Sequence, residues 1–124
     1  MSIEKPEVDF PGGEPPPTEL EISDIWEGDG PVAKAGNTVQ VHYVGVAYST
    51  GEEFDTSWSR GEPLEFKLGV GQVIAGWDQG VQGMRVGGRR QLIIPPGLAY
   101  GDRGAGRSIA PGETLIFVCD LVSA

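Results

Sequence analysis

The chain has 124 residues and a formal net charge of −9, and 39% of its residues are apolar. This length supports one domain with one core, because a chain of this size buries roughly two-thirds of its unfolded surface. The negative charge excludes a nucleic-acid-binding protein that relies on a basic surface, and no apolar run approaches the ~18 residues of a membrane span. We therefore expect a globular protein that contacts neither nucleic acid nor membrane.

Most of the negative charge lies at the amino-terminal end. Residues 1–30 hold nine acidic residues and one lysine, a net charge of −8, whereas residues 31–124 hold nine acidic and eight basic residues. The first 19 residues also contain five prolines and few side chains to bury, a composition typical of disorder. We expect residues 1–19 to form a disordered, acidic, proline-rich tail that serves solubility, and residues 20–124 to form the folded domain. No basic segment followed by an apolar one begins the chain, so we expect a cytoplasmic location.

Strands are predicted where apolar and polar residues alternate. The segment 38–48 is the clearest example, because Val39, Val41 and Tyr43 share one face while His42 lies on the other. Alternation or short apolar runs between turn signals predict further strands at 20–25, 53–56, 64–68, 89–94 and 114–122.

One helix is predicted from four apolar residues at helical spacing: Ile74, Trp77, Val81 and Met84. Two glycines within this segment cost ~1 kcal/mol each relative to alanine, so the helix should be short and held by packing. Small residues would also let it lie close against a sheet. The element order predicts an α+β fold, with a curled antiparallel sheet of five to six strands wrapped over one short helix.

Several kinds of enzyme site cannot be assembled from this sequence. His42 is the only histidine, and nothing recommends it for a nucleophile–histidine site. Cys119, the only cysteine, belongs to the apolar face of the last strand and is expected to be a small buried side chain. Clustered histidine and cysteine ligands are absent, and so is a phosphate loop of the GxxxxGK type. We therefore expect no metal, no cofactor and no hydrolytic or nucleotide chemistry.

Rotation about the peptide bond before a proline needs none of these groups. Its barrier of ~18–20 kcal/mol arises from amide resonance, and the twisted state has a less polar carbonyl than the planar state. A dry apolar cup with a few hydrogen bonds to the peptide can favour that twisted state. The materials required are aromatic walls and one or two polar side chains.

A set of short motifs supplies these materials in one order along the chain. The motifs are Val41-His42-Tyr43-Val44-Gly45, Gly51-Glu52-Glu53-Phe54-Asp55-Thr56-Ser57, Val73-Ile74-Ala75-Gly76-Trp77, Gly80-Val81-Gln82-Gly83-Met84-Arg85-Val86-Gly87, Ile94-Pro95-Pro96, Ala99-Tyr100-Gly101 and Leu115-Ile116-Phe117. Together they resemble the FKBP-type peptidyl-prolyl isomerases, the immunophilins that bind rapamycin-like macrolides. The resemblance covers residues 20–122. Any single motif is weak evidence, whereas the whole set in order is specific.

The resemblance implies a proline-binding pocket with an aromatic lining. Trp77 would form the floor beneath the prolyl ring. The walls and rim would be formed by Tyr43, Phe54, Phe117, Val73, Ile74, Leu64 and Phe66.

The resemblance also implies polar contacts to the substrate. Tyr100 would offer its hydroxyl to one substrate carbonyl, and the backbone N–H of Ile74 would anchor a second. Asp55 would lie beside the twisted amide carbonyl, with its charge held by Tyr43 and Arg60.

The chain departs from the common family pattern at the edge of the pocket. Ile109 would lie on the flexible loop that overhangs the pocket, where Ala105 and Ser108 stand in place of bulkier residues. Leu64 stands where an aromatic side chain is frequent, so one pocket edge should be thinner. These differences bear on substrate preference and macrolide affinity. Some family members carry an inserted chaperone domain or a long amino-terminal helix that makes them dimers. This sequence shows neither, so the resemblance implies a monomer.

Three readings of the function stay open at this point. The first is an enzyme that acts on prolines in unfolded or flexible proteins, assists their folding and binds macrolide inhibitors. The second is a binding module that holds prolines of a partner, although intact Asp55 and Tyr100 favour the enzyme. The third, an unrelated reader of proline-rich peptides, ranks last, because Trp77 lies on a helical pattern and Phe117 on a buried strand pattern.

Overall fold

The computed structural model describes residues 4–8, 14–105 and 109–124. Its elements, in chain order, are β1 (Glu21–Trp26), β2 (Thr38–Ala47), β3 (Glu53–Thr56), the 3-10 helix η1 (Trp58–Arg60), β4 (Leu64–Lys67), α1 (Ala75–Gly80), β5 (Arg89–Ile94), the 3-10 helices η2 (Pro96–Leu98) and η3 (Gly101–Arg103), and β6 (Leu115–Ser123). The predicted α+β class and the six strands are confirmed.

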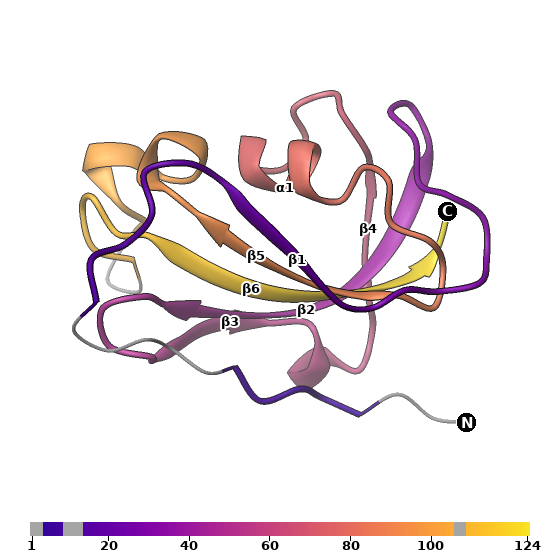
Figure 1. The fold of residues 1–124 in the computed structure, drawn as a ribbon, viewed down its shortest axis with the longest axis horizontal. Coiled ribbons are helices and arrows are strands. Elements are labelled where there is room, and N and C mark those ends of the chain that lie inside the picture. Colours follow the sequence, from indigo (N-terminus) through magenta and orange to yellow (C-terminus); the bar gives the residue numbers. More distant parts are fainter. Residues whose placement is uncertain (1–3, 9–13, 106–108) are drawn as a thin grey trace.

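The strands form one antiparallel sheet that curls around the helix (Figure 1). Their order is β1-β5-β6-β2-β3, and β4 also pairs with β2. Strands β3 and β4 share one edge of β2, because β4 pairs with residues 38–41 and β3 with residues 44–46. Helix η1 connects the two, so the chain leaves the sheet between them and returns.

Side-chain alternation gives the central strands two apolar faces. On the concave face, Tyr43 of β2 and Phe117 of β6 belong to the main core, which α1 covers. On the opposite face, which we call the back face, Val44 and Ile116 form a second, smaller cluster. The period of two predicted for β2 therefore holds, and it separates the pocket-facing tyrosine from the neighbouring His42.

Helix α1 lies close against β5 because two of its residues are glycines. A Cβ atom at Gly76 would lie 2.5 Å from the side chain of Ile94, and one at Gly80 would lie 2.6 Å from Leu92. The close approach expected from these glycines is confirmed. The helix ends at Gly80, but the next two residues of the predicted stripe, Val81 and Met84, are still buried in the turn that follows.

Parts of the amino-terminal segment lie on the back face. Lys5 pairs with Glu53 at 2.7 Å, the backbone carbonyl of Glu4 accepts from Arg89 at 2.8 Å, and Val8 packs against the smaller cluster. Figure 1 shows residues 4–8 passing beneath η1. Of the tail expected to be disordered, residues 1–3 and 9–13 lie outside the described residues. Within the described ranges, no helix is long and apolar enough to cross a membrane.

Candidate functional site

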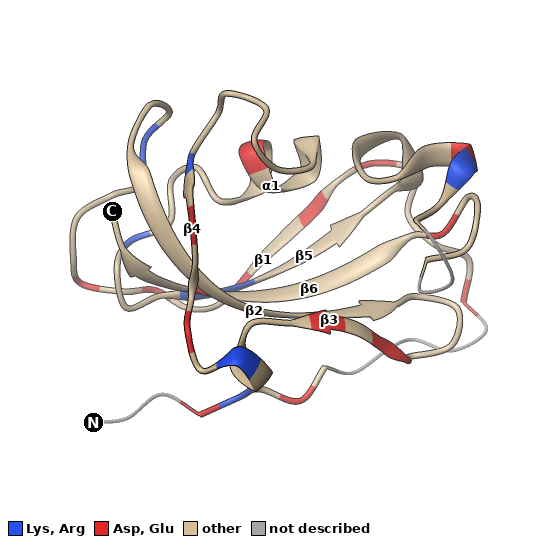
Figure 2. Ribbon diagram, turned by 180° about the vertical axis from the view of Figure 1, so that it is seen from behind, with Lys and Arg blue, Asp and Glu red and all other residues tan. Residues whose placement is uncertain are grey.

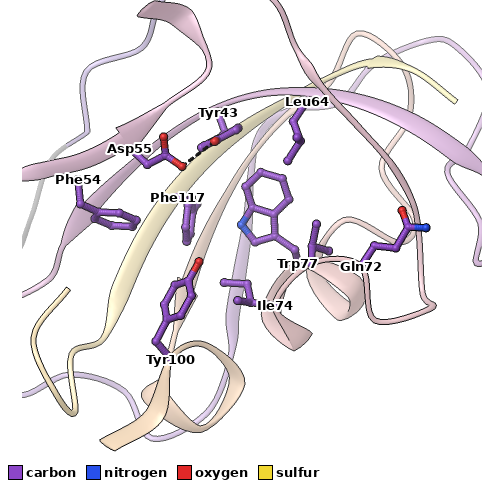
Figure 3. A pocket seen from close by; sticks show the side chains of 10 residues that line it. Tyr43, Phe54, Asp55, Leu64, Gln72, Ile74, Trp77, Tyr100 and Phe117 are labelled. Carbon is purple, nitrogen blue, oxygen red and sulfur yellow. Dashed lines mark hydrogen bonds between the residues drawn. The ribbon is translucent and has the colours of Figure 1, made fainter. Parts of the chain in front are cut away.

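A cavity of about 430 Å³ opens on the concave side of the sheet, between α1 and the loops that flank it (Figure 3). Its walls come from five elements and two loops. The lining residues are Tyr43, Phe54, Asp55, Leu64, Gln72, Val73, Ile74, Trp77, Tyr100 and Phe117.

Trp77 forms the floor of the cavity and is only 3% exposed. Tyr43 meets its indole edge-on at a centroid distance of 4.9 Å, and Phe117 does so at 5.3 Å. The indole Nε1 is buried and has no hydrogen-bond partner in the described part of the chain. In Figure 3 this nitrogen faces Phe117, whose ring meets the indole at an interplanar angle of 87°. The floor of the cavity is therefore aromatic and shielded from water.

Gly45 of β2 allows two aromatic walls to meet. Phe54 and Phe117 pack edge to face at 5.5 Å, across the strand on which this glycine lies. A Cβ atom at Gly45 would lie 2.7 Å from each of the two rings. The wall thus needs glycine at this position because any side chain would displace an aromatic ring.

The polar side of the cavity is built around Asp55. Tyr43 Oη donates to Asp55 Oδ2 at 2.7 Å, and the Arg60 guanidinium donates to Tyr43 Oη at 3.2 Å and lies 3.5 Å from Asp55 Oδ1. In Figure 2 the basic position of η1 lies close to the acidic positions of β3. Burial is the main cause that raises the pKa of Tyr43 above its ordinary value, and Arg60 opposes it. Tyr43 therefore stays protonated and donates to the carboxylate.

Tyr100 lies across the cavity from Asp55. Its side chain is 41% exposed, and its hydroxyl points into the cavity in Figure 3. Burial, and next the charge of Asp55, raise the pKa of Tyr100. The hydroxyl is thus a neutral hydrogen-bond donor at the mouth of an apolar cavity.

The described residues contain no group of three or more His, Cys, Asp or Glu side chains that could hold a metal ion. Cys119 is fully buried, and burial raises the pKa of its thiol. The arrangement can desolvate a ligand and hold it by hydrogen bonds.

The model of the family described as "FKBP-type peptidyl-prolyl cis-trans isomerase" matches residues 30–122. The chain belongs to this family. An FK506-binding protein of Streptomyces anulatus is 81% identical over 124 residues, which cover 99% of both chains. The peptidyl-prolyl cis-trans isomerase FPR2 of Saccharomyces cerevisiae is 53% identical over 90 residues, 73% of this chain and 67% of that protein. The crystal structure of AtFKBP13 aligns with a TM-score of 0.79 and 42% identity, over 94% of this chain and 100% of that chain.

Nine of the twelve site residues predicted from the sequence line the cavity. The other three are Arg60, Phe66 and Ile109. Arg60 lies behind the cavity wall and contacts Tyr43 and Asp55. Phe66 is buried beneath the floor, with its ring 5.7 Å from Trp77. Ile109 is buried in the main core and pairs with Ala105, whereas Ser108 lies outside the described residues.

Gln72 also lines the cavity, although no sequence pattern marked it as a site residue. Its Oε1 accepts from the backbone N–H of Lys67 at 2.8 Å, which fixes the loop before α1 against the end of β4. The residue lies in a loop, where no periodicity marks a side chain as buried or exposed. Its position beside Val73 and Ile74 in the chain was the only available signal.

Proposed function

We propose that the chain catalyses cis–trans isomerisation of Xaa-Pro bonds in this cavity. The observation that carries the proposal is the combination of an aromatic cavity with one carboxylate, Asp55, held at its rim by Tyr43. The proposal is supported by the family membership and by the yeast relative that bears the name of such an isomerase.

The proposed mechanism needs no covalent bond to the substrate. The prolyl ring would rest on Trp77 between Phe54 and Phe117, which removes water from the amide. Because the twisted amide has lost its resonance and its charge separation, an apolar surrounding favours it over the planar ground state. The cavity would therefore lower the barrier by binding the transition state more tightly than either planar isomer.

Hydrogen bonds at the rim would hold the rest of the peptide in place. The Tyr100 hydroxyl would donate to one substrate carbonyl, and the backbone N–H of Ile74 to another. Asp55 would lie beside the carbonyl of the rotating bond. As that carbonyl turns, its carbon becomes more electrophilic, so a nearby anionic oxygen favours the twisted geometry.

The substrates we propose are prolines in unfolded or flexible segments of other proteins. Uncatalysed isomerisation takes tens to hundreds of seconds and can limit folding, so such an activity would assist folding. We also propose that the cavity binds macrolides of the FK506 and rapamycin type, since the relative from Streptomyces anulatus is named for FK506 binding. A monomeric state and a cytoplasmic location remain predictions of the sequence.

A kinetic assay on a folded sample tests the proposal. The cis-to-trans rate of a short peptide with one Xaa-Pro bond is measured with the wild type, with Tyr100→Phe and with added rapamycin. We expect acceleration by the wild type, a reduced rate with Tyr100→Phe at unchanged stability, and loss of acceleration with the macrolide. A peptide that binds without faster conversion would instead make the domain a proline-binding module.

A further inference from the structure

His42 lies directly behind the pocket, on the back face of β2. Its imidazole stacks on the indole of Trp58 at a centroid distance of 4.3 Å and an interplanar angle of 17°. Its Nδ1 is 2.8 Å from Ser57 Oγ. The next residue along the strand, Tyr43, points to the other face and lines the cavity. His42 is therefore the immediate neighbour in β2 of Tyr43, whose hydroxyl holds Asp55.

The hydrogen bonds around Ser57 determine the role of the imidazole nitrogen. Ser57 Oγ accepts the backbone N–H of Tyr43 at 2.7 Å, so its own proton needs another acceptor. The carbonyl of Tyr43 is 3.4 Å away and already accepts from Ser57 N and Thr56 Oγ1. His42 Nδ1 is closer and unshared, so it accepts the hydroxyl proton, and the neutral imidazole carries its own proton on Nε2.

This pair is not the start of a hydrolytic triad. Ser57 is 0% exposed, and its oxygen is engaged by the backbone of Tyr43. The carboxylate across from His42 in the strand register, Asp120, is held by Arg89 at 2.6 and 2.7 Å. No substrate could reach the serine, and the acid is committed to another partner. The contact must act through structure rather than through nucleophilic chemistry.

Ser57 and Trp58 lie at the junction that carries two polar residues of the site. Asp55 is two positions before Ser57 at the end of β3, and Arg60 is two positions after Trp58 in η1. Strand β3 has only four residues, and among the described strands it pairs with β2 alone, with a register shift between Gly45 and Val46. The pairing alone therefore fixes this edge weakly, and contacts at its end set where the carboxylate and the guanidinium point.

We propose that His42 is a positioning residue for isomerisation. Its Nδ1 accepts the hydroxyl proton of Ser57, and this hydrogen bond holds the junction of β3 and η1 so that Asp55 and Arg60 meet Tyr43. The inference rests on the proposed function, because it assigns a role to a residue that touches neither the cavity nor the substrate. The imidazole is replaceable in principle by any side chain that offers an acceptor at the Nδ1 position.

Two substitutions separate the hydrogen bond from the ring stack. His42→Phe keeps an aromatic ring against Trp58 but offers no acceptor to Ser57. His42→Asn loses the ring but places Oδ1 where Nδ1 was. Ser57→Ala removes the hydroxyl, and Val118→Ala, on the same back face but outside this network, controls for general destabilisation.

The expected result is a change in turnover without a change in binding. His42→Phe should lower kcat about three- to tenfold at nearly constant KM, the range that one neutral hydrogen bond supports. Ser57→Ala should lower kcat at least as much, because it also removes the acceptor of the Tyr43 backbone N–H. His42→Asn should stay within about twofold of the wild type. The double variant His42→Phe/Ser57→Ala should match Ser57→Ala, because the hydrogen bond to His42 is already lost once the Ser57 hydroxyl is removed. Val118→Ala should lower the melting temperature and leave kcat unchanged.

The tautomer gives a second measurement that does not depend on activity. Long-range proton–nitrogen NMR spectra of the folded wild type at mildly alkaline pH should show Nε2 protonated and Nδ1 unprotonated. A proton on Nδ1, or a His42→Phe variant as active as the wild type, would overturn the positioning role alone. A folded wild type without isomerase activity would overturn the proposed function and this role with it.

Discussion

Tyr43 Oη and Asp55 Oδ2 lie 2.7 Å apart across the antiparallel pair of β2 and β3. The register sets Gly45 opposite Asp55. Tyr43 lies two residues before Gly45 in β2, so its side chain extends along the strand to reach the carboxylate. Arg60 closes the group from η1. A carboxylate at the rim of an apolar cavity is thus held in one orientation by a neutral donor and a cation.

The first prediction concerns this carboxylate. Asp55→Asn keeps the size and an acceptor oxygen but removes the charge, so turnover of a prolyl peptide should fall by about tenfold or more. The side chain of Asp55 is half exposed, so the melting temperature should change little. Glu62→Gln, which also removes one exposed acid near this edge, is the matched control and should leave turnover unchanged. Equal activity of Asp55→Asn and the wild type would remove Asp55 from the mechanism.

The second prediction concerns the packing of α1 on β5. Gly80→Ala should destabilise the fold by about 1–3 kcal/mol, because the new methyl overlaps Leu92, even though alanine favours helix. Gly97→Ala is the control, because a Cβ atom there meets nothing within 4 Å. Urea unfolding of both variants measures the difference. A Gly80→Ala variant more stable than the wild type would mean that the helix can move away from the sheet at little cost.

The strands and the α-helix could be predicted from the sequence, because the residue patterns that mark them are local. Alternation placed Tyr43 and His42 on opposite faces, and the helical stripe placed Trp77 against the sheet. The position of Gln72 in the cavity could not be predicted, because it depends on the path of a loop. The contact between Ser57 and His42 could not be predicted either, because it depends on the register of β3.

The third prediction concerns alkaline pH. Burial raises the pKa of Cys119, Tyr43 and Tyr100 in the folded state. The unfolded chain therefore loses these protons first, so the stability is fully present below the unfolded values and is lost as the pH rises past them. The loss should begin near ~8.5 through Cys119 and steepen near ~10 through the tyrosines.

Urea unfolding across this pH range, with Cys119→Ala as comparison, measures the effect. The variant should lose the early part of the decline and keep the later part. Turnover should not change between neutral pH and about pH 9, because both tyrosine hydroxyls remain protonated. A free energy of unfolding that rises above that pH would contradict the raised pKa values of these three groups in the folded state.

The fourth prediction concerns the amino-terminal segment. Deleting residues 1–17 removes the ion pair to Glu53, the contact of Val8 and the carbonyl that accepts from Tyr48 at 3.3 Å. The ion pair is exposed and contributes little, but uncovering the back-face cluster should cost about 1–3 kcal/mol. Turnover should stay the same if residues 20–124 form the isomerase unit, as we propose. A deletion variant with normal stability would make the segment a passive tail.

The proposed isomerase activity is tested most directly by the exchange rate between cis and trans isomers of a prolyl peptide, measured by NMR with catalytic amounts of the folded protein. Exchange should be far faster than without the protein, where it takes tens to hundreds of seconds. One equivalent of rapamycin per protein should abolish the acceleration, and Asp55→Asn should reduce it. Unchanged exchange in the presence of a folded protein that binds the peptide would contradict isomerase activity in this cavity.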